Sequence, residues 1–285
     1  MRCKMSKITV EEILQKVNAI PAFPATVIKL IKMMDDPNVS VSSIKEVIRT
    51  DEGLTVKLLR VANSAFYRGR REIKTIEDAV IVLGLRTVKS MIFSVTVSPI
   101  LSKELSGYDL GKEALWRQSQ LSAMTAQTIA KKCKFKEVDL AYTAGLLKDV
   151  GKVVLDEYVK NNFDEVMKEV EEKNVAFIEA ESDVLGFTHA EVGAKIAERW
   201  NLPPEIVEVI RYHHEPSKAE LNPKLAMICH LADDLIMMMG VNIGADGLAY
   251  HFDENSLEVL EMTAGDVTEI MSDIAEYVDL EETYF

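Results

Sequence analysis

The sequence predicts an all-α fold built from many short helices. Apolar residues recur at helical spacing along most of the chain, and capping residues precede several of these segments. Runs typical of strands are nearly absent. The composition is 48% hydrophobic and 28% charged, which is ordinary for a globular protein and argues against extensive disorder.

The expected helices of the N-terminal half begin at capping residues or at proline. Thr9-Val-Glu-Glu12 is a capping box, and Pro24 opens a helix that ends at Asp36-Pro37. Further helices are expected over residues 40–50, over 51–63, from Thr75 to an interruption at Gly84, and through 92–101.

The C-terminal half continues the helical pattern. Thr188-His-Ala-Glu191 is a second capping box, so a helix should begin there. The other helices are expected over 110–132, over 137–157 with a break near Gly151, from Pro203-Pro204 to before Pro216, over 222–239, near Asn255, and from Asp266.

The best internal boundary is Ser106-Gly107-Tyr108-Asp109. We therefore expect an N-terminal helical subdomain over 9–107, a second helical subdomain over 108–238 and a C-terminal helical extension over 239–285. There is no Gly/Ser-rich linker and no repeat of 20–50 residues, so the subdomains should pack against each other.

The charge balance restricts the partners. Lys plus Arg is 33 and Asp plus Glu is 46, which gives a net charge of −13. This charge disfavours membranes and nucleic acids unless the basic cluster over residues 68–74 forms one contiguous face. The chain has three cysteines, no apolar run of membrane-spanning length and no secretory signal pattern, so a cytoplasmic location is expected.

Histidines carry the first functional signal. All five lie after residue 185, and they are His189, His213, His214, His230 and His251. Asp149 lies in an apolar segment that is predicted to be helical, where an isolated carboxylate would be costly without a cationic partner. Imidazole and carboxylate together suit a first-row metal, but spacing alone leaves ordinary hydrogen-bonded histidines as the alternative.

A set of short motifs extends over about residues 9 to 280. They are Ile20-Pro-Ala-Phe-Pro24, Asp51-Glu-Gly-Leu54, Leu58-Leu-Arg-Val-Ala-Asn-Ser64, Leu115-Trp116, Gly145-Leu-Leu-Lys-Asp-Val-Gly-Lys152, His189-Ala-Glu-Val-Gly193, Trp200-Asn-Leu-Pro203, His213-His-Glu-Pro216 and His230-Leu-Ala-Asp233. In combination they resemble the HDOD domain, a helical bacterial signalling module related to the HD-type metal-dependent phosphohydrolases. The resemblance implies a multi-helical HDOD fold with a C-terminal HD-like part.

The resemblance also implies a degenerate metal site. Active HD enzymes have histidines where this chain has Gln118 and Lys148, and only Asp149 and Asp233 of that ligand set remain. An amide is a poorer ligand than imidazole, and an ammonium group has no lone pair. Two arrangements of Lys148 stay open: its ammonium replaces the lost cation beside the carboxylates, or its side chain turns outward to solvent.

A second metal position is implied by two-metal relatives. The residues that match it are Asp149, His189, His213 and His214. We expect no obligatory cofactor, and the alternative is a single residual divalent ion such as Fe, Mn or Zn.

These observations favour a non-catalytic signal-transduction module that acts through contacts with signalling proteins, and they disfavour an enzyme. The alternative is a metal-dependent phosphohydrolase or phosphodiesterase for a nucleotide or cyclic dinucleotide. Gln118 and Lys148 argue against that alternative because half of the water-activating ligand set is missing. The sequence does not define the partner, the signal or the oligomeric state.

Overall fold

The fold is all-α, as predicted. The computed structural model describes residues 13, 15, 23–36, 38–64, 67, 72–241, 244–247 and 255–284. Within these ranges every regular element is a helix, and one isolated antiparallel bridge joins Leu105 to Leu110. No helix in the described part of the chain is both long enough and apolar enough to span a bilayer.

Local hydrogen bonds explain where the N-terminal helices begin. The side chains of Ser40, Asp51 and Thr75 each accept a hydrogen bond from the backbone N–H three residues later. Gly84, with φ of +84°, separates two consecutive helices. The N-terminal helices are α2 (Ala25–Met34), α3 (Val41–Arg49), α4 (Glu52–Ala62), α5 (Ile76–Leu83) and α6 (Leu85–Leu101).

The described part of the C-terminal half contains the remaining α-helices and two short 3₁₀ helices. They are α7 (Ala114–Lys132), α8 (Val138–Leu147), α9 (Lys152–Asn161), α10 (Phe163–Lys173), α11 (Phe177–Leu185), α12 (His189–Arg199), α13 (Pro204–Tyr212), η1 (Pro216–Lys218), α14 (Pro223–Met239), η2 (Ala245–Gly247), α15 (Asn255–Val259) and α16 (Ala264–Tyr284). The capping box at Thr188 is present, with both of its reciprocal hydrogen bonds.

Three local expectations were wrong. Asp149 lies in the turn between α8 and α9 rather than inside a helix, because hydrogen bonds over three residues replace the α-helical pattern at 148–151. Thr263, not Asp266, caps the last helix: its hydroxyl accepts from the Asp266 N–H, and the Asp266 carboxylate accepts from the Thr263 N–H. Helices α10 and α11 were not predicted, because their buried stripes are short and lie among many charged residues.

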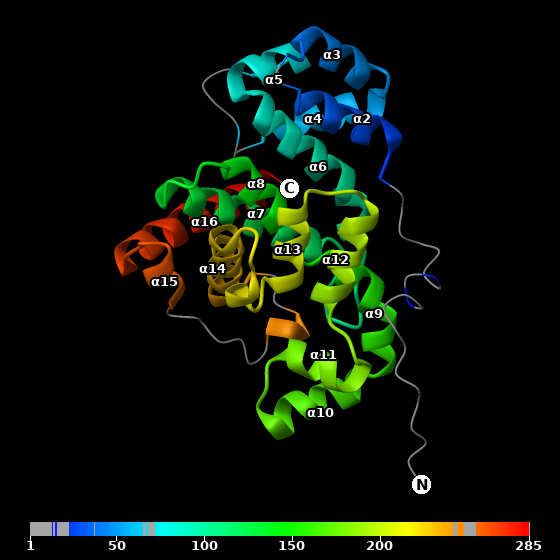
Figure 1. Ribbon diagram of the computed structural model, residues 1–285, viewed down its shortest axis with the longest axis vertical. Helices are drawn as coiled ribbons and strands as arrows, with labels where there is room; N and C mark the ends of the chain where they lie inside the picture. Colours follow the sequence, from blue (N-terminus) through cyan, green and yellow to red (C-terminus); the bar gives the residue numbers. More distant parts are fainter. Residues whose placement is uncertain are drawn as a thin grey trace.

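One hydrophobic core extends through both halves of the molecule. Helix α6 packs against α4 and α5 and also against α7 and α8, so it links the N-terminal helices to the rest (Figure 1). Helix α7 packs against α8 and α14. The boundaries at 107/108 and 238/239 stay a prediction, and the Thr9 capping box, residues 68–71 and His251 lie outside the described residues.

Candidate functional site

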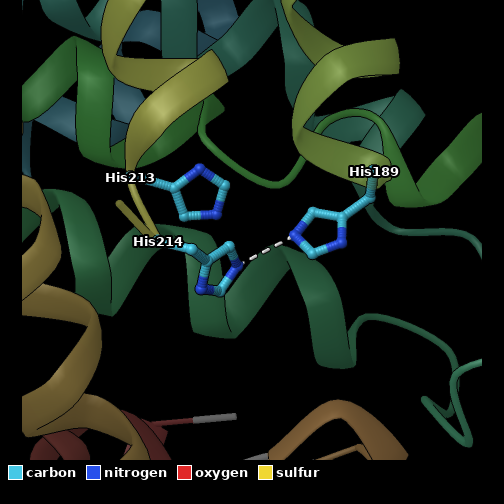
Figure 2. A group of neighbouring side chains, drawn as sticks. All are labelled: His189, His213 and His214. Atoms are coloured by element: carbon cyan, nitrogen blue, oxygen red, sulfur yellow. Dashed lines mark hydrogen bonds between the residues drawn. The ribbon is translucent and has the colours of Figure 1, made fainter. Parts of the chain in front are cut away.

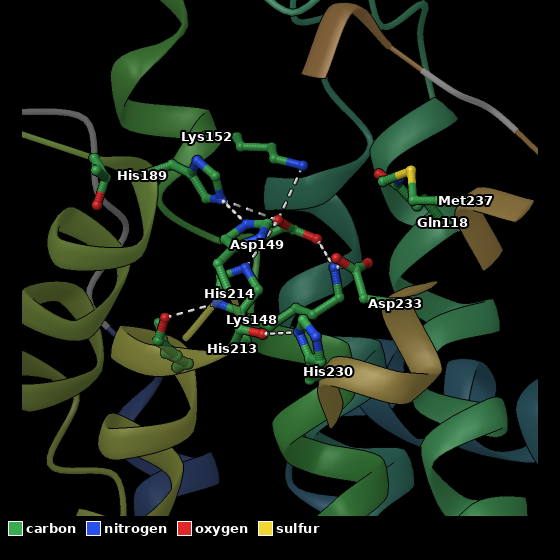
Figure 3. Close-up of polar contacts among 12 residues, drawn as sticks. Gln118, Lys148, Asp149, Lys152, His189, His213, His214, His230, Asp233 and Met237 are labelled. Atoms are coloured by element: carbon green, nitrogen blue, oxygen red, sulfur yellow. Dashed lines mark hydrogen bonds and ion pairs between the residues drawn. The ribbon is translucent and has the colours of Figure 1, made fainter. Parts of the chain in front are cut away.

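A buried polar cluster lies where the helix ends of the C-terminal half converge (Figure 3). The α8–α9 turn contributes Lys148 and Asp149, and α14 contributes Asp233. His189 is the first residue of α12, and His213 and His214 directly follow α13. The structure therefore brings together residues that are separated by up to 85 positions in the sequence.

Lys148 points inward and lies between two carboxylates. Its Nζ forms an ion pair with Asp149 and lies 2.5 Å from Oδ1 of Asp233. All three side chains are about 1% exposed. Burial alone lowers the pKa of Lys148, but the two carboxylates outweigh that effect and raise it above its usual value. The structure thus has the inward arrangement of Lys148 rather than the solvent-exposed one.

A second lysine, which the sequence did not single out, also contacts Asp149. Lys152 is the first residue of α9, and its Nζ lies 2.9 Å from Oδ1 of Asp149. The same ammonium lies 5.9 Å from the centroid of the Tyr108 ring. Burial raises the pKa of Asp149, but the positive charges of Lys148 and Lys152 dominate and hold it well below its usual range.

Three histidines face one another beside this lysine–carboxylate cluster (Figure 2). One nitrogen from each of His189, His213 and His214 lies within 4.8 Å of the others, and the Nε2 atoms of His189 and His214 are 3.1 Å apart. Oδ1 of Asp149 lies 3.6 Å from Nε2 of His189 and 3.8 Å from Nε2 of His213. All four residues expected to form the residual metal position therefore converge.

Buried acceptors orient two of the imidazoles. His189 Nδ1–H donates to Oε2 of Glu181 over 2.8 Å, and His213 Nδ1–H donates to the backbone carbonyl of Ile210 over 2.9 Å. Carboxylate and carbonyl oxygens only accept hydrogen bonds, so in the neutral form of each ring the lone pair lies on Nε2, toward the centre of the cluster. Metal-binding histidines are typically oriented in this way.

Glu181 is a site residue that sequence reasoning missed. Its carboxylate accepts from the His189 side chain and from the His189 backbone N–H at 3.0 Å, and it accepts from the Tyr108 hydroxyl at 2.6 Å. Its position on α11 was hidden because that helix was not predicted. A carboxylate in a charged segment gives no sequence signal of burial.

Desolvation favours the neutral form of two of the histidines. Burial lowers the pKa of His213 to about 3 and lowers the pKa of His214 well below its usual value. The carboxylates of Asp149 and Asp233 and the ammonium groups of Lys148 and Lys152 are buried beside these imidazoles. Carboxylate oxygens together with the inward lone pairs of His189 and His213 are ligand types that suit a divalent transition metal.

The other candidate residues lie at the edge of the cluster. Gln118 on α7 is fully buried, and its amide contacts Sδ of Met237 at 3.8 Å. His230 donates from Nδ1 to the His213 carbonyl at 2.7 Å, and its Nε2 lies 3.6 Å from Asp234. His230 thus supports the chain at His213 instead of joining the three histidines.

A close backbone approach holds His189 in place. A Cβ on Gly151 would lie 1.9 Å from the His189 carbonyl oxygen and 2.7 Å from the Gly193 nitrogen. Glycine at position 151 therefore lets the α8–α9 turn lie directly against the first turn of α12. The turn that carries Asp149 and the helix that begins at His189 meet at this contact.

Comparison with known families supports the assignment suggested by these residues. Residues 20–216 match the model of the HDOD domain, which is more than half of the chain. The protein belongs to the HDOD family. An uncharacterized protein of Treponema pallidum is 28% identical over 203 residues, which are 71% of this chain but 39% of that protein. This chain thus spans well under half the length of that relative.

Solved structures share the fold. An HDOD domain protein of unknown function from Geobacter sulfurreducens is 26% identical with a TM-score of 0.77, and the match covers 95% of this chain and 94% of that one. A putative signal transduction protein from Marinobacter aquaeolei is 24% identical with a TM-score of 0.76, and the match covers 95% of this chain and 60% of that one. A putative phosphohydrolase from Shewanella amazonensis is 24% identical with a TM-score of 0.65, and the match covers 92% of this chain and 97% of that one.

Proposed function

We propose that this HDOD chain is a non-catalytic signal-transduction module that acts through contacts with a protein partner. The observation that carries the proposal is the position of Lys148. Its ammonium lies between Asp149 and Asp233, the two carboxylates that remain of the HD ligand set. A fixed side-chain cation there neutralises the carboxylates but cannot bind and activate water as a metal ion does.

The pocket then has a structural or ligand-sensing role. The buried ion pairs of Lys148 and Lys152 with Asp149 and Asp233 join the α8–α9 turn and α9 to α14. They stabilise this helix arrangement only while the charges remain paired, because an unpaired buried charge is costly. A signal that alters the cluster would therefore alter how these helices pack. Because α8 also packs against α6, such a change would reach the N-terminal helices.

A second candidate function rests on the three histidines. The inward Nε2 lone pairs of His189 and His213, with a ring nitrogen of His214, could hold one divalent transition metal, and Asp149 would complete the set if Lys152 released its Oδ1. Such an ion would supply Lewis acidity for a phosphohydrolase. Lys148 and Lys152 oppose this function, because both already engage Asp149.

We expect no turnover of phosphate esters by the purified chain. Bis(p-nitrophenyl) phosphate, p-nitrophenyl phosphate and a cyclic dinucleotide would be incubated with the protein in the presence of Mn²⁺, Fe²⁺ or Mg²⁺, and product release followed over hours. Turnover that persists through repeated purification and disappears in Asp149→Ala would refute the non-catalytic proposal in favour of the hydrolase.

The histidine cluster makes a separate prediction about metal content. If the three imidazoles act as ligands, protein purified without chelators or a histidine tag should contain about one transition-metal ion per chain by elemental mass spectrometry. His213→Ala should lose that ion, and His230→Asn, which keeps a donor toward the His213 carbonyl, should retain it. Metal-free wild-type protein that also fails to take up added Zn²⁺ would leave the cluster with a purely structural role.

A further inference from the structure

Charge is divided very unevenly along this chain. Residues 1–107 contain 17 Lys and Arg against 11 Asp and Glu, whereas residues 108–285 contain 16 against 35. The first part is therefore basic, although the whole chain is strongly acidic. An asymmetry of this size favours contacts between surfaces of opposite sign.

The contacting helices α4 and α5 expose both apolar side chains and cations. Val56 on α4 is 60% exposed, and Ile81 and Val82 on the neighbouring α5 are 72% and 54% exposed. Lys57 and Arg60 share the exposed side of α4 with Val56. Neither cation has an ion pair among the described residues. We call these five residues the basic face.

A complementary surface lies on α15 and the turn that follows it. Val259 is 50% exposed, and it lies between the exposed side chains of Glu258 and Glu261. Neither glutamate forms an ion pair within the described ranges. We call these three residues the acidic face. Each face thus combines exposed apolar side chains with charges that form no ion pair among the described residues.

The two faces of one molecule do not meet. Figure 1 shows α4 and α5 at the upper end of the molecule, and α15 lower on the left, below α16 and beside α14. A contact between the basic face and the acidic face therefore needs two molecules. A nucleic acid could contact Lys57 and Arg60 through its phosphates, but it would leave Ile81 and Val82 exposed to water.

We propose that the basic face docks on the acidic face of a second copy of this chain. In a two-fold dimer the contact forms twice, because each copy contributes both faces. The apolar side chains would lie at the centre of each contact and the opposite charges at its rim, as in other protein interfaces. This proposal does not depend on the state of the Lys148 pocket.

The test is association measured by analytical ultracentrifugation on two charge-reversed proteins. Variant one is Lys57→Glu with Arg60→Glu, and variant two is Glu258→Lys with Glu261→Lys. We expect the wild type to form dimers, and each variant alone to associate at least about tenfold more weakly, because like charges then face each other. Mixing the two variants should restore the dimer, since both contacts regain opposite charges.

A matched control reverses two cations elsewhere. Lys29→Glu with Lys32→Glu changes the net charge equally on exposed positions of α2 and should leave association unchanged. Circular dichroism on every variant verifies that the helices are intact. A wild type that stays monomeric to about 100 μM, a dimer that neither charge reversal weakens, or a mixture that fails to reassociate would overturn the proposal.

Discussion

Replacing Lys148 with alanine is expected to lower the free energy of unfolding by about 3–5 kcal/mol. The substitution removes the ammonium that lies between the buried carboxylates of Asp233 and Asp149, and it leaves Lys152 as the remaining lysine beside Asp149. Taking one partner from a buried ion pair is far more costly than losing an exposed pair, since water cannot reach the remaining charge. Urea denaturation followed by circular dichroism measures the change.

Two further variants separate electrostatics from lost packing. Lys148→Ala combined with Asp233→Asn should recover part of the stability, because the second change removes the uncompensated charge. Lys218→Ala removes a lysine whose ion pair with Glu215 is more than half exposed, and no measurable change is expected. A loss below about 1 kcal/mol in Lys148→Ala would show that the pair contributes little and would contradict this account of the pocket.

The second large effect is expected at Gly151. Gly151→Ala would place a Cβ 1.9 Å from the His189 carbonyl oxygen, so the α8–α9 turn and α12 must separate. Backbone atoms cannot rotate away as a side chain can. The cost should therefore reach or exceed the upper end of the usual overpacking range, about 3 kcal/mol. The same denaturation measurement applies.

Gly111→Ala is the matched control. A Cβ at Gly111 would have no atom within 4 Å, and its φ lies outside the positive region that disfavours side chains. We expect no loss of stability there, and the reduced freedom of the unfolded chain favours a slight gain. If Gly151→Ala proved as stable as Gly111→Ala, the close contact between the turn and α12 would not exist in solution.

Much of the fold followed from local sequence patterns. Four helices begin at side-chain caps, which are Ser40, Asp51, Thr75 and Thr188. Each cap acts through a hydrogen bond to the backbone three residues later, so the neighbouring residues in the sequence are enough to predict the helix start. Gly84 predicted a helix boundary because glycine readily adopts the positive φ that it has between the two helices. The short stripes of α10 and α11 escaped prediction, because their helices gain stability mainly from packing against other parts of the chain.

The sequence predicted several residues of the candidate site but not how their side chains are arranged. The motifs identified Lys148, Asp149 and the histidines as candidates. They did not identify Lys152, Glu181 or Tyr108, whose roles come from contacts across the fold. A lysine or glutamate in the sequence is ordinarily a surface residue, and only burial makes it a functional partner.

By itself, the sequence determined that the chain is helical and where most helices begin, and it predicted Gln118, Lys148, Asp149 and the histidines as site residues. Only the tertiary structure decided that Lys148 turns inward between Asp149 and Asp233, and that His189 meets the pair after α13. Helix signals act over three or four residues, whereas the orientation of a side chain depends on which distant helix ends pack beside it.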